Sequence, residues 1–133
     1  MAELISKLTL TGTAADLGAA LALSVSTTLT IDEPFVGISR ITATTTGGNS
    51  IIAPSANIPR YVYIKHTGLN DAGSSSGDRV LVELADNGDR NQIMELKSGE
   101  FAFFPYYQGG AGILQLQASA NTVRVEYAFF TRG

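Results

Sequence analysis

Side chains capable of acid–base or nucleophilic chemistry are scarce in this chain. Its 133 residues include one histidine, His66, and no cysteine. A serine triad would need His66 beside an activated serine, and the sequence has no Gly-x-Ser-x-Gly segment that would present one. One histidine without cysteine also cannot form a multi-histidine or thiolate metal centre within one chain. We therefore interpret His66 as a structural residue at the end of a strand, and we expect no catalytic residue, no metal and no cofactor.

The acidic residues favour turns over catalysis. A glycosidase needs two carboxyl groups on either side of a sugar in a cleft. Four aspartates instead neighbour Gly or Asn, where the carboxylate typically accepts hydrogen bonds from its own backbone: Asp71, Asp78, Asp86 and Asp89. The Asp86–Asp89 segment has oxygen ligands for Ca²⁺ but lacks the spacing to a closing Glu that an EF-hand loop requires. We expect that the protein is not an enzyme.

Aromatic residues gather in the C-terminal half of the chain. The run from Phe101 to Tyr107 could stack on sugars or bases, or it could form the core and a subunit contact, which we favour. A carbohydrate-binding module would use Tyr106, Tyr107 and the Asp86–Asp89 turn, and this alternative stays open. The residues that we expect at an interface between subunits are Tyr61, Tyr63, Phe104, Tyr106, Tyr107 and Phe130.

Alternation with a period of two residues predicts the strands that must position these side chains. Between Leu21 and Ile31 the large apolar residues all lie at odd positions, with Ser and Thr at most of the other positions. This pattern predicts a long strand with one buried face and one hydroxylated face. Tyr61–Ile64 is apolar on both faces, which is typical of a central strand or of one lying under a subunit contact. Val123–Phe129 alternates apolar with charged residues.

Turn residues separate the predicted strands at short intervals. Asn87-Gly88 is the pair expected in a tight hairpin, and Ser98-Gly99 predicts a second hairpin between Ile93–Lys97 and Glu100–Phe104. The Asp71–Asp78 segment is rich in Gly and Ser but has no Lys and no following helix, unlike a phosphate-binding loop. We predict it to be a flexible surface loop with nothing to bury. Helical character is confined to Ala14–Ala20.

Many short strands with Gly-rich turns predict an all-β fold. The favoured architecture is a jelly-roll-like antiparallel β-sandwich, with an immunoglobulin-like sandwich as the alternative. At 133 residues the chain is expected to form one domain that exposes about 6,700 Å² when folded. We assign residues 19–133 to a single β-sandwich domain and residues 1–18 to an N-terminal arm or a first strand.

Composition limits the partners. The net charge of -3, with nine basic and twelve acidic residues, disfavours non-specific nucleic-acid binding. Neither a secretory signal nor an apolar run long enough to cross a bilayer is visible, so we expect synthesis in a cytoplasm and no membrane partner. Charged residues make up 16% of the chain, against about 25% in typical domains. We interpret the low charge as a surface that is partly covered by partner subunits.

Three segments carry a family resemblance: Tyr61–Thr67, Leu96–Pro105 and Val123–Phe130. Together they resemble a pattern in small virion structural proteins of tailed bacteriophages, notably those that infect cyanobacteria. The match covers about half of the chain, and Gly-Glu-Phe-Ala-Phe-Phe-Pro at residues 99–105 is its most specific part. Ser98 stands where Pro is usual, and His66 stands where Asn is usual. The pattern is a β-scaffold signature and implies no catalytic residues.

The resemblance implies a structural role in a virion. The expected function is that of a capsid decoration (cement) protein that forms a homo-oligomer, expected to be a trimer, on the phage head and contacts the major capsid protein. The protein would be made in the host cytoplasm and end in the virion. One alternative is a tail, neck or fibre-associated virion protein, and the other is the carbohydrate-binding jelly-roll module described above.

Overall fold

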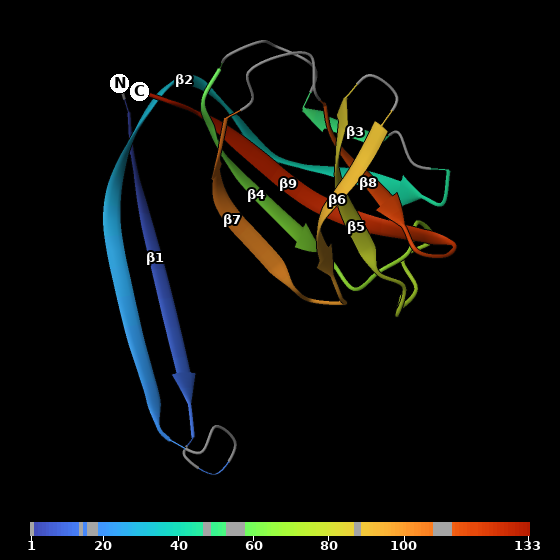
Figure 1. Cartoon of the computed structure of the whole chain (residues 1–133), viewed down its shortest axis with the longest axis horizontal. Helices are drawn as coiled ribbons and strands as arrows, with labels where there is room; N and C mark the ends of the chain where they lie inside the picture. Colours follow the sequence, from blue (N-terminus) through green and yellow to red (C-terminus); the bar gives the residue numbers. More distant parts are fainter. Residues whose placement is uncertain are drawn as a thin grey trace.

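The structure is a computed structural model that describes residues 2–13, 15, 19–46, 49–52, 58–86, 89–107 and 113–133. These residues form nine strands, arranged as two antiparallel sheets that pack face to face in a sandwich (Figure 1). The strands are β1 (Ala2–Gly12), β2 (Leu21–Thr44), β3 (Asn49–Ile52), β4 (Arg60–His66), β5 (Val80–Asp86), β6 (Asp89–Leu96), β7 (Phe101–Tyr106), β8 (Ile113–Ala118) and β9 (Thr122–Arg132). The prediction of an all-β antiparallel sandwich is confirmed.

The strand order is nested. The five-stranded sheet has the order β1-β2-β9-β4-β7, and the four-stranded sheet has the order β3-β8-β5-β6. Strand β5 pairs with β6, β4 with β7, β3 with β8 and β2 with β9, so the chain from β2 to β9 pairs like one long folded hairpin. Strand β1 lies outside this nest and pairs with β2 at one edge of the five-stranded sheet.

The core lies between the two sheets. Val62 and Ile64 of β4 and Val123 and Val125 of β9 contribute fully buried side chains from the five-stranded sheet. The four-stranded sheet contributes its own inward residues, among them Val80, Val82, Leu114, Leu116 and Ala118. Burying apolar surface stabilises the fold by about 25 cal/mol per Å². The sandwich therefore has an apolar core supplied by alternate residues of its strands, as period-two alternation requires.

The hairpin of β1 and β2 extends beyond the sandwich (Figure 1). Strand β1 pairs with β2 from Leu21 to Ile31, whereas β9 pairs with β2 only from Ile31 onward. Register shifts between Asp32 and Ser39 mark irregular pairing at the point where the hairpin leaves the sheet. Such bulges bend and twist a strand. We call Ala2–Gly12 together with Leu21–Ile31 the arm.

One of the two predicted hairpins is confirmed and the other is wrong. Asp86 pairs with Asp89, so β5 and β6 form a hairpin, although the Asn87-Gly88 pair itself lies outside the described residues. The Ser98-Gly99 turn instead leads from β6 in one sheet to β7 in the other. Gly99 has a φ of 83°, and Glu100 N–H donates to the Lys97 carbonyl at 2.9 Å. Turn residues predict a reversal of the chain but not whether the two strands then pair.

The prediction that the Asp71–Asp78 loop buries nothing is also wrong. Ser76 is buried, and its N–H donates to the Gly68 carbonyl at 2.8 Å. Asn70 N–H donates to the Ser74 carbonyl at 2.8 Å, and Ser74 N–H donates to Asn70 Oδ1 at 2.9 Å. Backbone hydrogen bonds and the Asn70 side chain thus fold this loop on itself.

Two predictions from the sequence concern helices. Ala14 and residues 16–18, within the segment of helical character, lie outside the described residues. Across the described residues, no helix has the length and apolar character needed to span a membrane.

Candidate assembly surface

The outer face of the five-stranded sheet is apolar in its centre. Because Val62 and Ile64 point into the core, Tyr61 and Tyr63 point outward. Tyr63 is paired across β4 and β7 with Phe103, and Tyr61 is paired across β4 and β9 with Phe130. Directly paired residues lie on the same face of a sheet. These four aromatic residues therefore share the outer face, on the side opposite the core.

Ring contacts organise this aromatic row. The rings of Tyr61 and Phe103 stack with their centroids 6.0 Å apart. The guanidinium of Arg132 lies 5.2 Å from the Tyr61 ring centroid, a cation–π contact. Burial and, secondarily, the nearby Glu126 carboxylate raise the pKa of Tyr63 above its ordinary value. The Tyr63 phenol is therefore neutral at physiological pH, and the row carries no ionised group of its own.

The arm also has an apolar face. Residues directly opposite each other in its register are Leu4 and Leu29, Leu8 and Val25, Leu10 and Leu23. The other face carries mostly hydroxyl groups, for example where Thr9 lies opposite Ser24. The prediction that the apolar face of Leu21–Ile31 is buried is wrong within one chain, because Leu21, Leu23 and Val25 are exposed. The cause is the projection of the arm beyond β9, which leaves this face without a covering layer.

The apolar face of the arm is continuous with the outer face of the sheet. Ile31, at the base of the arm, is paired with Arg132 of β9, and Arg132 lies on the same side of β9 as Phe130 and Ala128. Ile31 and Ala128 are 4% and 2% exposed, yet neither belongs to the core cluster between the sheets. They form the floor of a surface that runs from the arm onto the sheet.

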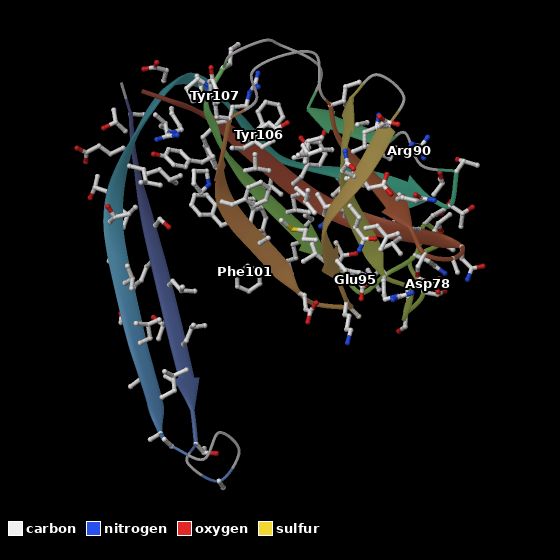
Figure 2. All side chains as sticks on the ribbon, in the orientation of Figure 1. Asp78, Arg90, Glu95, Phe101, Tyr106 and Tyr107 are labelled. Carbon is white, nitrogen blue, oxygen red and sulfur yellow. The ribbon has the colours of Figure 1, made fainter. Side chains whose placement is uncertain are left out.

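Between the arm and the sheet lies an open groove of about 770 Å³. Its lining on the arm side is the run from Leu4 to Leu8, which includes Lys7. Its lining on the sheet side is aromatic and aliphatic, and includes Ile38, Tyr63, Phe101, Phe103, Phe104, Ala128 and Phe130. Figure 2 shows Phe101 at the start of β7, on the side toward the arm. Phe101 is 62% exposed and Ile38 is 70% exposed. We call this groove with the apolar face of the arm the assembly surface.

A polar region borders the assembly surface at the far end of the sheet. Arg40 Nη2 lies 3.1 Å from Glu126 Oε1, and Lys65 is paired across β4 and β9 with Glu126. Arg124 Nη2 donates to the Asp71 carbonyl at 2.7 Å. An apolar centre bordered by charged residues is the usual anatomy of a protein–protein interface.

The six residues predicted at a subunit interface fall in different places. Tyr61, Tyr63 and Phe130 lie on the outer face of the five-stranded sheet, within or beside the groove. Phe104 packs against the core and also lines the groove, whereas Tyr106 is a core residue that is 8% exposed. Burial raises the pKa of Tyr106, and the Arg60 guanidinium acts in the opposite direction. Tyr107 is 61% exposed, just beyond β7.

The prediction missed the contribution of the arm and of Ile38. The alternation from Leu21 to Ile31 was visible, but alternation alone does not reveal whether a layer covers the apolar face. Phe101 and Phe103 alternate with Ala102 and Phe104, as the sequence predicts, and point outward.

His66 has a structural position. It is fully buried at the end of β4. Gly68 N–H donates to Nδ1 at 2.9 Å, so Nδ1 carries no proton, and Nε2 donates to the Asp78 carbonyl at 2.7 Å. Both ring nitrogens are thus engaged with the backbone of the adjoining loop. Among the described residues, no group of three or more His, Asp or Glu side chains is arranged to hold a metal ion.

Comparison with known proteins finds no family model that matches the chain and no similar curated protein. The resemblance to phage virion proteins therefore stays a prediction, and the assembly surface is the main guide to function.

Proposed function

We propose that this protein is a structural virion subunit, a capsid decoration (cement) protein that oligomerises on a phage head and contacts the major capsid protein. The observation that carries the proposal is the assembly surface, in which the arm and the outer face of the five-stranded sheet expose one continuous apolar face. Soluble monomers rarely expose a contiguous apolar patch of more than about 300–600 Å². A surface of this kind is typical of a subunit that functions in an assembly.

The polar groups beside this surface favour the same interpretation. The face of the arm that carries Thr9 and Ser24 is mainly hydroxylated, and its charged residues are Glu3 and Lys7. Hydroxyl groups can be covered by a partner with far less loss of hydration free energy than charged groups. The low charge of the chain, 16%, agrees with a protein of which much of the surface is shared with neighbours.

We also infer that the sandwich is a jelly roll. Eight strands, β2 to β9, pair in nested order across two four-membered layers, with β1 added at one edge. A jelly roll is an eight-stranded double sheet built from two Greek keys. The nested pairing supports this architecture over the immunoglobulin-like alternative, in which the sheets have a different strand order.

The function proposed for this fold is mechanical. A decoration subunit bridges neighbouring capsid subunits and stabilises the shell against the pressure of the packaged genome. The projecting arm suits such bridging, because it extends the reach of a small domain beyond its own sandwich (Figure 1). The engagement of both His66 nitrogens in backbone hydrogen bonds supports a role without histidine-based catalysis.

The test is binding of the purified protein to phage heads from which it has been stripped. We expect saturable binding to stripped heads, no binding to heads that are already decorated, and hundreds of copies per virion by quantitative mass spectrometry. A protein that binds neither stripped heads nor any other part of the particle would contradict the proposal. A copy number of a few to some tens would instead support the tail, neck or fibre alternative.

The carbohydrate-binding alternative depends on aromatic side chains that a sugar can reach. Tyr107 is exposed, but Tyr106 lies in the core and offers no ring face to a ligand. This arrangement weakens the pair that the alternative requires. Glycan binding that disappears in Tyr107→Ala would revive it.

A further inference from the structure

We propose that the partner of the assembly surface is a second copy of this chain, and that the arm of each copy lies in the groove of a neighbouring copy. The inference rests on the proposed function, since it specifies how subunits of such a protein would hold together. It assigns the groove an occupant and assigns the arm a binding site.

The arm would be marginally stable if nothing covered it. Over Leu21–Thr30 the strand β2 has β1 as its one partner strand. An isolated two-stranded hairpin is at best marginally stable in water, and a third strand or a packed apolar face is needed to hold it. The apolar face of the arm is exposed at Leu8, Leu23 and Val25. The arm therefore needs a surface supplied from outside its own chain.

The surface that the chain exposes is large enough for such a contact. The chain exposes 7683 Å², whereas a compact protein of 14.0 kDa is expected to expose about 6,700 Å². The excess of about 1,000 Å² is close to the area of about 800 Å² that each partner buries in a stable protein–protein interface. One exchanged arm and one filled groove per chain would cover an area of this size.

Each chain carries both halves of the proposed contact. The arm offers an aliphatic face, and the groove offers an aromatic wall that includes Tyr63, Phe101 and Phe103. Identical copies satisfy both at once, because every chain gives one arm and receives one. Contacts between two different patches of one chain form twice in a two-fold dimer, close into a ring where the rotation between copies closes, or otherwise continue as an open filament.

Charge is consistent with a second copy as the occupant. Within Ala2–Gly12 and Leu21–Ile31 the charged residues are Glu3 and Lys7, which cancel. The aromatic wall carries no charged side chain. A chain with a net charge of -3 can thus approach a copy of itself through an arm without net charge and a sheet wall without charged side chains, whereas a strongly charged partner would find no complement there.

The test uses two variants that each disable one half of the contact. Val25→Asp places a charge on the apolar face of the arm, and Phe101→Asp places one in the groove. Both side chains are more than half exposed in the single chain, so the sandwich should fold, as circular dichroism and thermal unfolding can verify. Ser24→Asp, on the hydroxylated face next to Val25, is the matched control.

Light scattering coupled to gel filtration gives the first readout. We expect the wild type and Ser24→Asp to be oligomers and each of the other variants, alone, to associate more than tenfold more weakly. A mixture of Val25→Asp and Phe101→Asp should form mixed complexes, because the first retains an intact groove and the second an intact arm. Variants that remain fully oligomeric, or a mixture that stays monomeric, would overturn the inference.

Crosslinking provides a second readout that does not depend on the charge variants. The chain has no cysteine, so Val25→Cys and Phe101→Cys each introduce a single thiol. Mixed in equal amounts, with one carrying an affinity tag, they should be linked by a flexible bismaleimide into tagged–untagged pairs. Ser24→Cys in place of Val25→Cys should give far fewer pairs, and equal yields would count against arm exchange.

These outcomes separate the inference from the proposed function. A wild type that is monomeric in solution but coats stripped heads would overturn arm exchange and leave the decoration role intact. A wild type that exchanges arms but binds no part of the virion would support the inference and contradict the proposed function.

Discussion

His66 is a histidine whose two ring nitrogens both form hydrogen bonds with the backbone. Its two ring nitrogens connect the end of β4 to the backbone at Gly68 and Asp78. The protonation pattern follows from geometry, since Nδ1 accepts and Nε2 donates. Sequence reasoning assigned His66 a structural role because no partner for catalysis was visible, and its complete burial gives that role a physical basis.

Replacing His66 tests this role. We expect His66→Ala to lower the free energy of unfolding by about 3 kcal/mol, because it creates a cavity and leaves two backbone groups without partners. His66→Asn should lose less, since its side-chain oxygen can still accept from the Gly68 N–H. Urea denaturation measures both values. Equal losses for the two variants would show that the Gly68 hydrogen bond contributes nothing.

Two tyrosines with raised pKa values predict a loss of stability in alkaline solution. Burial raises the pKa of both Tyr63 and Tyr106 in the folded chain above the unfolded value of about 10. Below the unfolded pKa, both the folded and the unfolded chain keep the phenols protonated, and the free energy of unfolding has its full value. As the pH rises from the unfolded pKa through the folded pKa, the free energy of unfolding falls. Denaturation from about pH 8 to about pH 11 should show this fall. Tyr63→Phe should make it shallower, and an unchanged slope would contradict the assignment.

At the scale of elements, the connection between β6 and β7 depends on one backbone conformation. Gly99 has a φ of 83°, which side-chain-bearing residues adopt at a cost of about 1 kcal/mol. We expect Gly99→Ala to destabilise the fold by about that amount. Gly77→Ala, at a position where an added Cβ meets nothing within 4 Å, is the matched control and should be nearly neutral. Similar unfolding midpoints for both variants would contradict the strain at Gly99.

The arm should show the difference between a free and a covered element. Hydrogen exchange should be slow in Ala2–Gly12 when the wild type is assembled and fast in Val25→Asp, because a two-stranded hairpin opens readily without a packed face. Strands β5 and β8 should stay protected in both, since their core residues are unaffected. Mass spectrometry of peptic peptides gives the comparison. Fast exchange of the arm in the assembled wild type would show that no partner covers it.

The sequence predicted individual strands and turns better than it predicted which strands pair and which faces are covered. Alternation predicted Leu21–Ile31 as a strand, a run that is apolar on both faces predicted Tyr61–Ile64 as another, and Asn87-Gly88 marked a hairpin, because these signals are local. The same signals could not show that Ser98-Gly99 joins two sheets or that the face of Leu21–Ile31 is uncovered. Both depend on pairings between distant parts of the chain, such as β2 with β9 and β4 with β7.

Of the candidate interface residues, Tyr61, Tyr63 and Phe130 lie on the outer face, where a partner could reach them, whereas Tyr106 lies in the core. Tyr106 belongs to an alternating strand, so its direction depends on the register of β7 against β4. A shift of one residue reverses the face of every side chain in a strand. The arm contributes to the same surface through residues far away in the sequence, which no local motif connects.

At the scale of the whole molecule, composition and shape support one account. The chain has a low charge and an arm with one mainly hydroxylated face. It also exposes about 1,000 Å² more surface than a compact chain of its size would. These features fit a subunit of a larger assembly. The core between the two sheets is complete within one chain. The apolar surface that remains is on the opposite side of the five-stranded sheet, which separates the surfaces for folding and for association.

The most direct test of this account is the molar mass of the wild-type protein in solution, measured by light scattering over a range of concentrations. The account predicts a mass that is an integer multiple of 14.0 kDa and that falls toward one subunit on dilution. A mass of a single subunit at every concentration would contradict it.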